Sequence, residues 1–309
     1  MRHLIDSRDL SVREIASLLR TADAILAHPK EYAAACAGQK IATLFYEPST
    51  RTRLSFEAAM LELGGAVLGF SSQDSSSAAK GESVADTIRI VSGYADAIVL
   101  RHPKEGAPVV AAKYAAVPVI NAGDGGHNHP TQTLTDLMTI HRELGGLEGL
   151  TVGLCGDLKF GRTVHSLVSA MTRYPGTRFV LIAPQELQAP EYVLDMIRQA
   201  PAECSFTLRR SMEEVMPSLD VLYMTRVQKE RFFNEADYVR LRDSFVLDPR
   251  KLRGAKTGMI VMHPLPRVNE IDPKVDESPY ARYFEQANYG KYIRMALLLA
   301  LLKGEGGAL

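Results

Sequence analysis

The sequence predicts an α/β protein with two doubly wound parallel-sheet domains and an active site in the cleft between them. Apolar, strand-like runs alternate with helical runs along most of the chain, as expected when helices cover both faces of a parallel sheet. The 309 residues suit two domains of roughly 150 residues each, and 46% hydrophobic residues can fill two cores. Polar clusters follow the strand-like runs, where open α/β sheets bind ligands.

The first half of the chain contains the first alternating series. Ser11 and Glu14 have the spacing of a capping box and predict a helix that ends before Pro29. Helical runs are also predicted after Arg51, Ser83 and Ala107. The strand-like runs between them are IATLFY, AVLGFS, AIVLRH and VPVINAG.

The second half repeats the pattern. A long helix is predicted from Pro130, a favourable residue in a first turn, and the strand-like runs LTVGLCG, RFVLIAP, DVLYMTR and GMIVMHP follow it. The apolar segment MALLLALL near the end is expected to pack into a core, because an apolar helix needs cover. The predicted domains are 1–130 plus 288–309 and 146–287, with 131–145 as the connecting helix.

Composition excludes several classes of protein. Lysine plus arginine equals aspartate plus glutamate, 36 of each, so no basic surface for nucleic acid is expected. MRHLIDSRDLS lacks the apolar stretch of a signal peptide, and MALLLALL is too short to span a membrane. The three cysteines, Cys36, Cys155 and Cys204, have no metal-binding spacing and are expected to be buried free thiols. We therefore expect a cytoplasmic protein with no membrane partner.

An anion site is predicted where FYEPSTRTRLSFEAAM passes from a strand to a helix. The first N–H groups of a helix lack intrahelical partners and favour anions. Here they are joined by hydroxyl groups and by guanidinium groups, which bind oxyanions bidentately. The pattern is not the G-x-x-x-x-G-K-[ST] loop of nucleotide-binding proteins. The residues of this cluster are Ser49, Thr50, Arg51, Thr52 and Arg53.

The other polar clusters at strand ends point to a two-substrate enzyme rather than a scaffold. The segment HNHP does not predict a metal site, because no third ligand stands at a suitable spacing. The segment GDLKFG does not fit the dinucleotide fingerprint, and no acidic residue follows the next strand. The clusters are RHP (101–103), GDGGHNHPTQ (123–132), GDLKFGRT (156–163), TRVQKER (225–231) and HPLPR (263–267).

This series of motifs resembles the aspartate and ornithine carbamoyltransferases. STRTR matches their carbamoyl-phosphate signature, and RHP, HPTQ, GDLKFGRTVHSL, YMTRVQKER and HPLPR follow in family order. Ornithine enzymes carry S-M-G and H-C-L-P at the later positions, so TRVQKER and HPLP place the chain in the aspartate branch. The resemblance implies carbamoyl transfer from carbamoyl phosphate to L-aspartate, giving N-carbamoyl-L-aspartate and phosphate, an early step of pyrimidine synthesis.

The resemblance also implies how carbamoyl phosphate is bound. Arg101 would bridge its phosphate and carbonyl oxygen, His129 would polarise that oxygen, and Gln132 would hold the carbamoyl NH2. The prolines of HPLPR have fixed φ angles and would keep backbone carbonyls in place. The remaining implied residues are Ser49, Thr50, Arg51 and Thr52 around the phosphate, Ser76 (with Ser75 and Ser77 as alternatives) from a serine-rich loop, and Pro264, Leu265 and Pro266 beside the carbamoyl group.

Such a reaction needs no covalent nucleophile, metal or cofactor, because positioning and electrostatics are sufficient. The leaving phosphate is the expected base, with His129 as the alternative. A silent homologue that serves only in assembly would be expected to lose phosphate-site arginines or the histidine. The residues implied to be catalytic, Arg51, Thr52, Arg101 and His129, are all present.

The resemblance also implies that the aspartate site is formed by residues of the second predicted domain and of a neighbouring chain. Arg162 would bind the α-carboxylate, and Arg226 and Gln228 the side-chain carboxylate. Lys80 would enter from the next chain, which implies a homotrimer with shared sites. Phe160 stands where family members often have tyrosine, so this chain lacks the hydroxyl group and its hydrogen bond at that position. The sequence leaves open whether the trimer stands alone, joins regulatory chains or pairs with a dihydroorotase.

Overall fold

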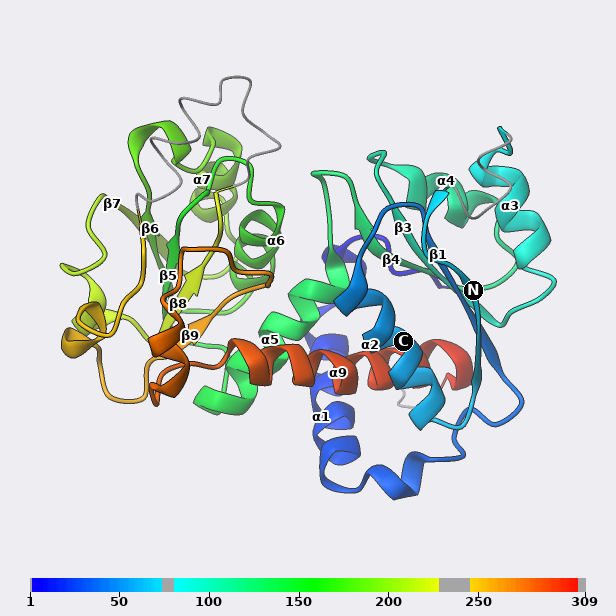
Figure 1. Cartoon of the computed structure of the whole chain (residues 1–309). Coiled ribbons are helices and arrows are strands. Elements are labelled where there is room, and N and C mark those ends of the chain that lie inside the picture. Colours follow the sequence, from blue (N-terminus) through cyan, green and yellow to red (C-terminus); the bar gives the residue numbers. More distant parts are fainter. Residues whose placement is uncertain (1, 74–80, 228–244, 305–309) are drawn as a thin grey trace. The chain divides into compact units, whose positions relative to one another are not determined.

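The computed structural model describes residues 2–73, 81–227 and 245–304 (Figure 1). The chain forms two compact units. Unit 1 comprises Met1–Met138 and Ala287–Leu309, and unit 2 comprises Thr139–Gln286. Each unit contains a parallel sheet, which confirms the predicted fold class.

The sheet of unit 1 has the order β2-β1-β3-β4, and its strand pairs are parallel. The chain passes from β1 outward to β2 and then returns to the other side of β1. The point of reversal lies between β1 and β3, where ligands bind in doubly wound sheets. The strands are β1 (Lys40–Phe45), β2 (Ala66–Phe70), β3 (Ala97–His102) and β4 (Val119–Asp124).

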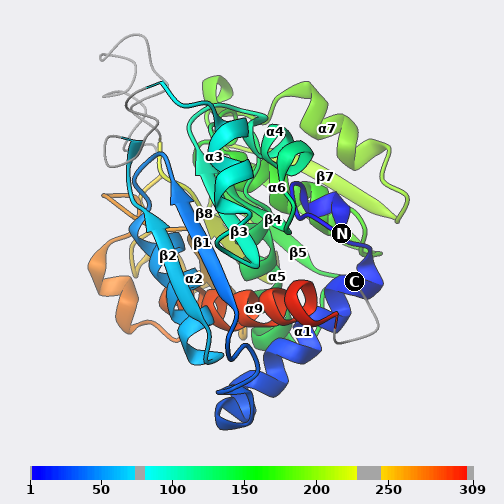
Figure 2. The same ribbon diagram turned by 90° about the vertical axis from the view of Figure 1, so that its right-hand side faces the viewer.

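Helices of unit 1 include one from each end of the chain. The last helix, α9, begins in unit 2 and crosses into unit 1, where it lies beside α2 (Figures 1 and 2). Its apolar residues from Ile293 to Leu299 are buried, as an apolar helix requires. The helices are α1 (Val12–Ala27), α2 (Thr50–Glu62), α3 (Val84–Val91), α4 (Ala107–Tyr114), α5 (Pro130–Leu144) and α9 (Tyr283–Lys303), with short 3-10 helices at Ser7–Asp9 and Pro29–Tyr32. The unit boundary falls within α5, after Met138.

The predicted capping box at the start of α1 is confirmed. The Ser11 hydroxyl accepts a hydrogen bond from the Glu14 backbone N–H at 3.2 Å, and the Glu14 carboxylate accepts one from the Ser11 N–H at 2.6 Å. Glu14 also pairs with Arg2. The hydrogen bond from Arg2 lowers the pKa of Glu14 to about 2.

This pairing predicts an acid-sensitive contribution to stability. The pKa of Glu14 is lower in the folded state, so its contribution is complete above a pH of about 4.5 and is lost as the pH falls towards 2. Glu14→Gln should lower the free energy of unfolding by about 1 kcal/mol at pH 7. In urea unfolding at pH 7, 5, 4 and 3, the difference from the wild type should shrink at the acid end. Glu31→Gln, at an exposed carboxylate, should show no such trend.

The sheet of unit 2 has the order β7-β6-β5-β8-β9 and is again parallel. Its point of reversal lies between β5 and β8. Strand β7 is an addition to the predicted elements; it is an edge strand with mostly exposed side chains, so it lacks the apolar run of a central strand. The elements are β5 (Thr151–Cys155), α6 (Arg162–Met171), β6 (Thr177–Ile182), α7 (Glu191–Arg198), β7 (Cys204–Arg209), β8 (Val221–Met224) and β9 (Ile260–Met262), with 3-10 helices at Gln185–Leu187, Met216–Ser218, Lys251–Gly254 and Pro273–Glu277.

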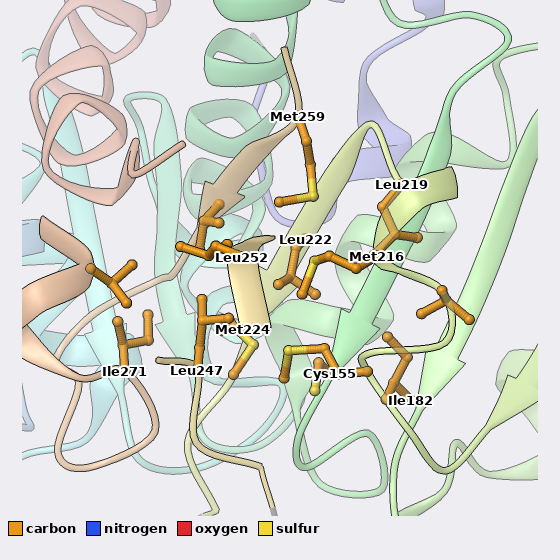
Figure 3. Packing of buried hydrophobic residues seen from close by; sticks show 14 of the residues in the cluster. Cys155, Ile182, Met216, Leu219, Leu222, Met224, Leu247, Leu252, Met259 and Ile271 are labelled. Atoms are coloured by element: carbon orange, nitrogen blue, oxygen red, sulfur yellow. The ribbon is translucent and has the colours of Figure 1, made fainter. Parts of the chain in front are cut away.

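A methionine-rich core fills one face of this sheet (Figure 3). Met216, Met224 and Met259 belong to this core together with Cys155, whose thiol is fully buried. Burial raises the pKa of the Cys155 thiol well above its usual range, so it remains protonated and unreactive. Cys36 and Cys155 are buried, as predicted. The prediction of burial is wrong for Cys204, which is half-buried on the edge strand β7.

Among the described residues, no helix combines the length and the apolar character needed to cross a membrane.

Candidate active site

The anion-binding segment lies at the point of reversal of the first sheet. Helix α2 starts at Thr50, directly after β1, with Ser49 as its N-cap. Ser11 and Ser83 cap α1 and α3 by accepting a backbone N–H, but the Ser49 side chain makes no such hydrogen bond to the described residues of α2. The hydroxyl and the first N–H groups of α2 can therefore bind an external anion. In this turn Thr52 is buried and Arg51 is exposed.

Arg101 extends from the end of β3 towards the same loop. Its side chain is only 11% exposed, and its Nη2 lies 2.6 Å from a carboxylate oxygen of Glu47, just before the Ser49 turn. Its Nη1 donates to the Ala122 carbonyl at 3.1 Å. Burial lowers the pKa of Arg101, and the Glu47 carboxylate opposes this effect. Its Nε is buried with no hydrogen-bond partner among the described residues, as expected of a group that binds a ligand.

His129 meets Arg101 across a glycine. Gly123 has a φ of +118°, and a Cβ placed there would lie 2.7 Å from Arg101 Nη1 and 3.5 Å from His129 Cδ2. A larger residue would therefore displace the Arg101 guanidinium. His129 is buried and precedes Pro130 at the start of α5. The structure thus brings together the arginine and the histidine that the sequence predicted for one carbonyl oxygen.

Gln132 is oriented by a series of polar side-chain contacts that extends to the last helix. Its Nε2 donates to Asp136 Oδ1 at 2.8 Å, one turn further along α5. Asp136 interacts electrostatically with Arg294 of α9, which donates to Ser55 of α2 at 2.9 Å. Burial lowers the pKa of Arg294 to about 10, so the guanidinium remains charged at neutral pH. This support could not be predicted from the sequence, because its members follow no motif.

Replacing this buried guanidinium should be costly. Arg294→Ala removes its attraction for the Asp136 carboxylate and its hydrogen bond to Ser55, and should destabilise the protein by about 3 kcal/mol. Lys291→Ala, in the same helix, removes an ion pair with Glu62, which is 43% exposed, and should cost less than about 1 kcal/mol. Thermal unfolding of both variants measures the difference. Equal losses would contradict the role assigned to Arg294.

In unit 2, the loops that follow β5 and β8 hold the candidate aspartate residues. Arg162 is the first residue of α6, and Arg226 follows β8. Thr225 links the two loops, since its Oγ1 accepts a hydrogen bond from the Asp157 N–H at 3.0 Å. A Cβ on Gly156, whose φ is +118°, would lie 2.3 Å from the Thr225 carbonyl oxygen, so only glycine permits this approach. Both arginines consequently follow adjacent strands at the carboxyl edge of the sheet.

The HPLPR loop is held from inside by a buried pair. His263 Nδ1 accepts a hydrogen bond from the Leu265 N–H at 2.8 Å, and its Nε2 lies 2.7 Å from Glu270 Oε1. Burial opposes ionisation of Glu270, but the hydrogen bond to His263 and those from backbone N–H groups outweigh it and lower the pKa of the carboxyl group. The Leu265–Pro266 peptide bond is cis. Pro264 and Leu265 are half-buried, and Pro266 is exposed.

Three predicted site residues, Ser76, Lys80 and Gln228, lie outside the described residues. Phe160 lies within them, and its N–H donates to Asp157 Oδ1 at 2.9 Å. Within 2–73, 81–227 and 245–304, no group of three or more His, Cys, Asp or Glu side chains could hold a metal ion.

Comparison with known families assigns both halves of the chain. Residues 2–142 match the model of the aspartate/ornithine carbamoyltransferase, carbamoyl-P binding domain. Residues 148–301 match the Asp/Orn binding domain of the same family. The second match includes most of α9, although the structure places Ala287–Leu309 in unit 1.

Individual relatives agree along nearly their whole length. The chain is 63% identical over 302 residues to an aspartate carbamoyltransferase catalytic subunit from Lachnoclostridium phytofermentans, covering 98% of each. It is 57% identical over 301 residues to one from Clostridium kluyveri, covering 97% of this chain and 98% of the other. Two solved structures share the fold. Trypanosoma cruzi aspartate transcarbamoylase, in complex with N-(phosphonacetyl)-L-aspartic acid, has a TM-score of 0.91, 40% identity and coverage of 97% and 96%. The catalytic subunit from M. jannaschii has a TM-score of 0.91, 45% identity and coverage of 99% and 100%.

Proposed function

The chain belongs to the aspartate/ornithine carbamoyltransferase family, and from this premise we propose that it transfers the carbamoyl group of carbamoyl phosphate to the amine of L-aspartate. The products are N-carbamoyl-L-aspartate and phosphate. The observation that carries this function is the convergence of Arg101 and His129 on Gly123, next to the Ser49 turn. This arrangement offers hydrogen-bond donors for a carbonyl oxygen beside donors for a phosphate.

Chemistry proceeds by attack of a neutral amine on the carbamoyl carbon. The carbonyl oxygen gains negative charge in the tetrahedral intermediate, where Arg101, His129 and Thr52 stabilise it. The carbon–oxygen bond to phosphate then breaks, and the leaving phosphate takes the amine proton. Ser49, Thr50 and the Arg51 guanidinium bind that phosphate throughout. Gln132, held by Asp136, orients the carbamoyl NH2.

Aspartate binding is assigned to unit 2. Arg162 binds the α-carboxylate, and Arg226 binds the side-chain carboxylate with Gln228. Guanidinium groups suit this task because they bind carboxylates with two parallel hydrogen bonds. The HPLPR loop, held by His263 and Glu270, keeps its backbone carbonyls directed at the attacking amine and the carbamoyl NH2.

Domain roles and assembly follow the same assignment. Residues 1–130 with 288–309 bind carbamoyl phosphate, 146–287 bind aspartate, and 131–145 connect them. The enzyme acts in the cytoplasm, in pyrimidine synthesis, as a homotrimer in which Ser76 and Lys80 complete the site of a neighbouring chain. Sharing of sites between chains is tested by mixing two inactive variants, Lys80→Ala and Arg226→Ala. In a mixed trimer, some sites should combine the intact Lys80 of one chain with the intact Arg226 of the next, so part of the activity should return.

The first test is carbamoyl transfer by the purified chain, offered carbamoyl phosphate with aspartate or ornithine in parallel. Formation of carbamoyl-aspartate with phosphate release is expected, with no transfer to ornithine. Transfer to ornithine alone would refute the assignment of unit 2 but preserve that of unit 1. No transfer to either amine by a folded protein that binds phosphate would favour a role in assembly only.

A further inference from the structure

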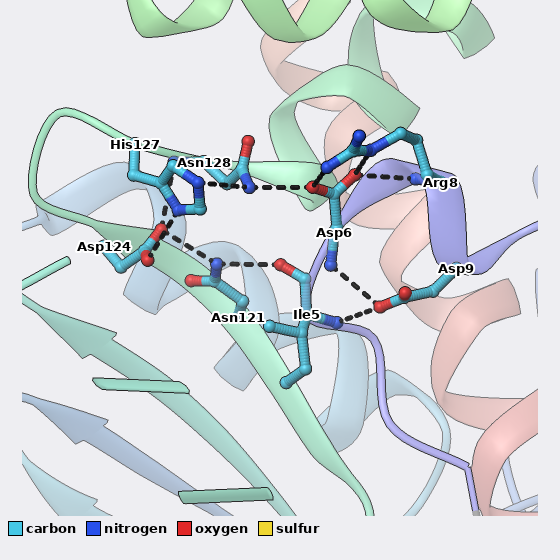
Figure 4. Close-up of polar contacts among 8 residues, drawn as sticks. All are labelled: Ile5, Asp6, Arg8, Asp9, Asn121, Asp124, His127 and Asn128. Atoms are coloured by element: carbon cyan, nitrogen blue, oxygen red, sulfur yellow. Dashed lines mark hydrogen bonds and ion pairs between the residues drawn. The ribbon is translucent and has the colours of Figure 1, made fainter. Parts of the chain in front are cut away.

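A buried carboxylate at the end of β4 joins several loops of unit 1. Asp124 is 1% exposed. Its Oδ1 accepts hydrogen bonds from the Asn121 side-chain amide at 3.1 Å and from the Asn128 N–H at 3.0 Å (Figure 4). Its Oδ2 accepts one from the Gly106 N–H at 2.9 Å and lies 3.1 Å from His127 Nδ1. Both carboxylate oxygens therefore have two partners each, the full capacity of the group.

These partners belong to the two segments that carry Arg101 and His129. Gly106 is the N-cap of α4 and ends the turn that follows β3. The turn that contains Asn128 leads directly into His129. A further hydrogen bond, from the Gly125 N–H to the His102 carbonyl at 2.9 Å, joins the same two turns. The Asp124 side chain thus fastens one turn to the other.

We propose that Asp124 is a positioning residue for carbamoyl transfer, which holds the turn after β3 and the turn before α5 so that Arg101 and His129 contact the same carbonyl oxygen. The inference rests on the proposed function of these two residues. Their separation is tightly set, because both side chains lie close to the position that a Cβ on Gly123 would occupy. A displacement of about 1 Å in such a group can cost about 100-fold in rate.

The N-terminal segment braces the same turn from its outer side (Figure 4). The Asn121 amide that contacts Asp124 also donates to the Ile5 carbonyl at 3.0 Å. The Asn128 side chain donates to Asp6 Oδ2 at 2.9 Å. The network therefore continues from the buried carboxylate to the 3-10 helix at Ser7–Asp9, whose N-cap is Asp6.

The test is Asp124→Asn, which preserves shape but replaces one acceptor oxygen with an NH2 group. Whichever way the amide turns, its NH2 faces a backbone N–H, of Gly106 or of Asn128, and cannot accept it. We expect kcat per folded molecule to fall about 100-fold and the KM for carbamoyl phosphate to rise several-fold. The KM for aspartate should stay within about twofold, because the aspartate arginines belong to unit 2.

Two further variants separate positioning from stability. Asp96→Asn changes a carboxylate that accepts the Lys40 N–H at 2.7 Å, at the opposite edge of the same sheet, and should keep wild-type kcat. His127→Ala removes one exposed contact to Asp124 and should lower kcat about threefold with little change in melting temperature. The His127 variant decides the question if Asp124→Asn does not fold.

Each outcome has a distinct meaning. Wild-type kcat per folded molecule in the Asp124 variant, with only a lower melting temperature, would overturn the positioning role. An equal rise of both KM values would do the same, because it indicates general disruption. If Asp124→Asn does not fold, unchanged kcat in His127→Ala overturns the proposal. A wild-type protein that transfers nothing to aspartate would instead refute the proposed function, and the positioning role with it.

Discussion

Arg51→Ala is expected to lower kcat/KM for carbamoyl phosphate by about 10³-fold, because a guanidinium that stabilises charge on a phosphate in the transition state is worth about that much. Arg51 lies in the first turn of α2 and is exposed. Its removal should therefore leave the free energy of unfolding nearly unchanged. Steady-state kinetics and urea unfolding of the same preparation measure both quantities.

Arg53→Ala provides a matched control two residues further along the helix. The Arg53 Nε donates to Glu57 Oε1 at 2.6 Å, so this guanidinium is already paired within α2. Glu57 keeps a hydrogen bond from the Thr43 hydroxyl at 3.0 Å after the substitution. We expect turnover within about threefold of the wild type. If Arg53→Ala were as inactive as Arg51→Ala, the assignment of the phosphate to Arg51 in particular would be wrong.

Arg226→Ala is expected to reduce the preference for aspartate over asparagine. The proposed contact of Arg226 is the side-chain carboxylate, which asparagine lacks. A hydrogen-bonded charged pair contributes about 1.5–3 kcal/mol, so kcat/KM for aspartate should fall roughly 10- to 100-fold. The value for asparagine should change little. The ratio of the two, measured at saturating carbamoyl phosphate, reports the specificity directly.

Two control measurements test whether the effect of Arg226→Ala is specific to the side-chain carboxylate. Phosphate binding by the Arg226 variant should match the wild type, since the phosphate residues belong to unit 1. Arg178→Ala, at the amino edge of the same sheet, should keep the preference for aspartate, because Arg178 contacts the Thr151 hydroxyl at 3.1 Å. An unchanged aspartate-to-asparagine ratio in Arg226→Ala would assign the side-chain carboxylate to another group.

Fold class and most elements could be predicted because their signals are local. The strand β1 is apolar over consecutive residues, and α2 begins at the hydroxyl-rich turn directly after it. The capping box of α1 needs only two residues at a fixed spacing. Strand β7 could not be predicted in this way, since its side chains are mostly exposed and it is defined by pairing with β6.

The candidate site likewise contains residues that local motifs predict and residues that only tertiary contacts bring to it. The side chains proposed to contact substrates stand in short motifs beside strand ends, so the family resemblance of these motifs could indicate Arg101 and His129. The groups that hold these two side chains in place could not be predicted from the sequence, because they lie far apart in the chain. Glu47 pairs with Arg101, Asp124 joins two turns, and Arg294 reaches Asp136 from the far end of the chain.

By itself the sequence determined which residues stand at the ends of the parallel strands and, through its motifs, which chemistry they offer. The tertiary structure alone decided which of them meet and what supports them. The physical reason is that hydrogen bonds and ion pairs depend on distances set by folding. Gly123 illustrates both parts: the sequence contains a glycine, but only the fold places the Arg101 guanidinium and the His129 ring against it.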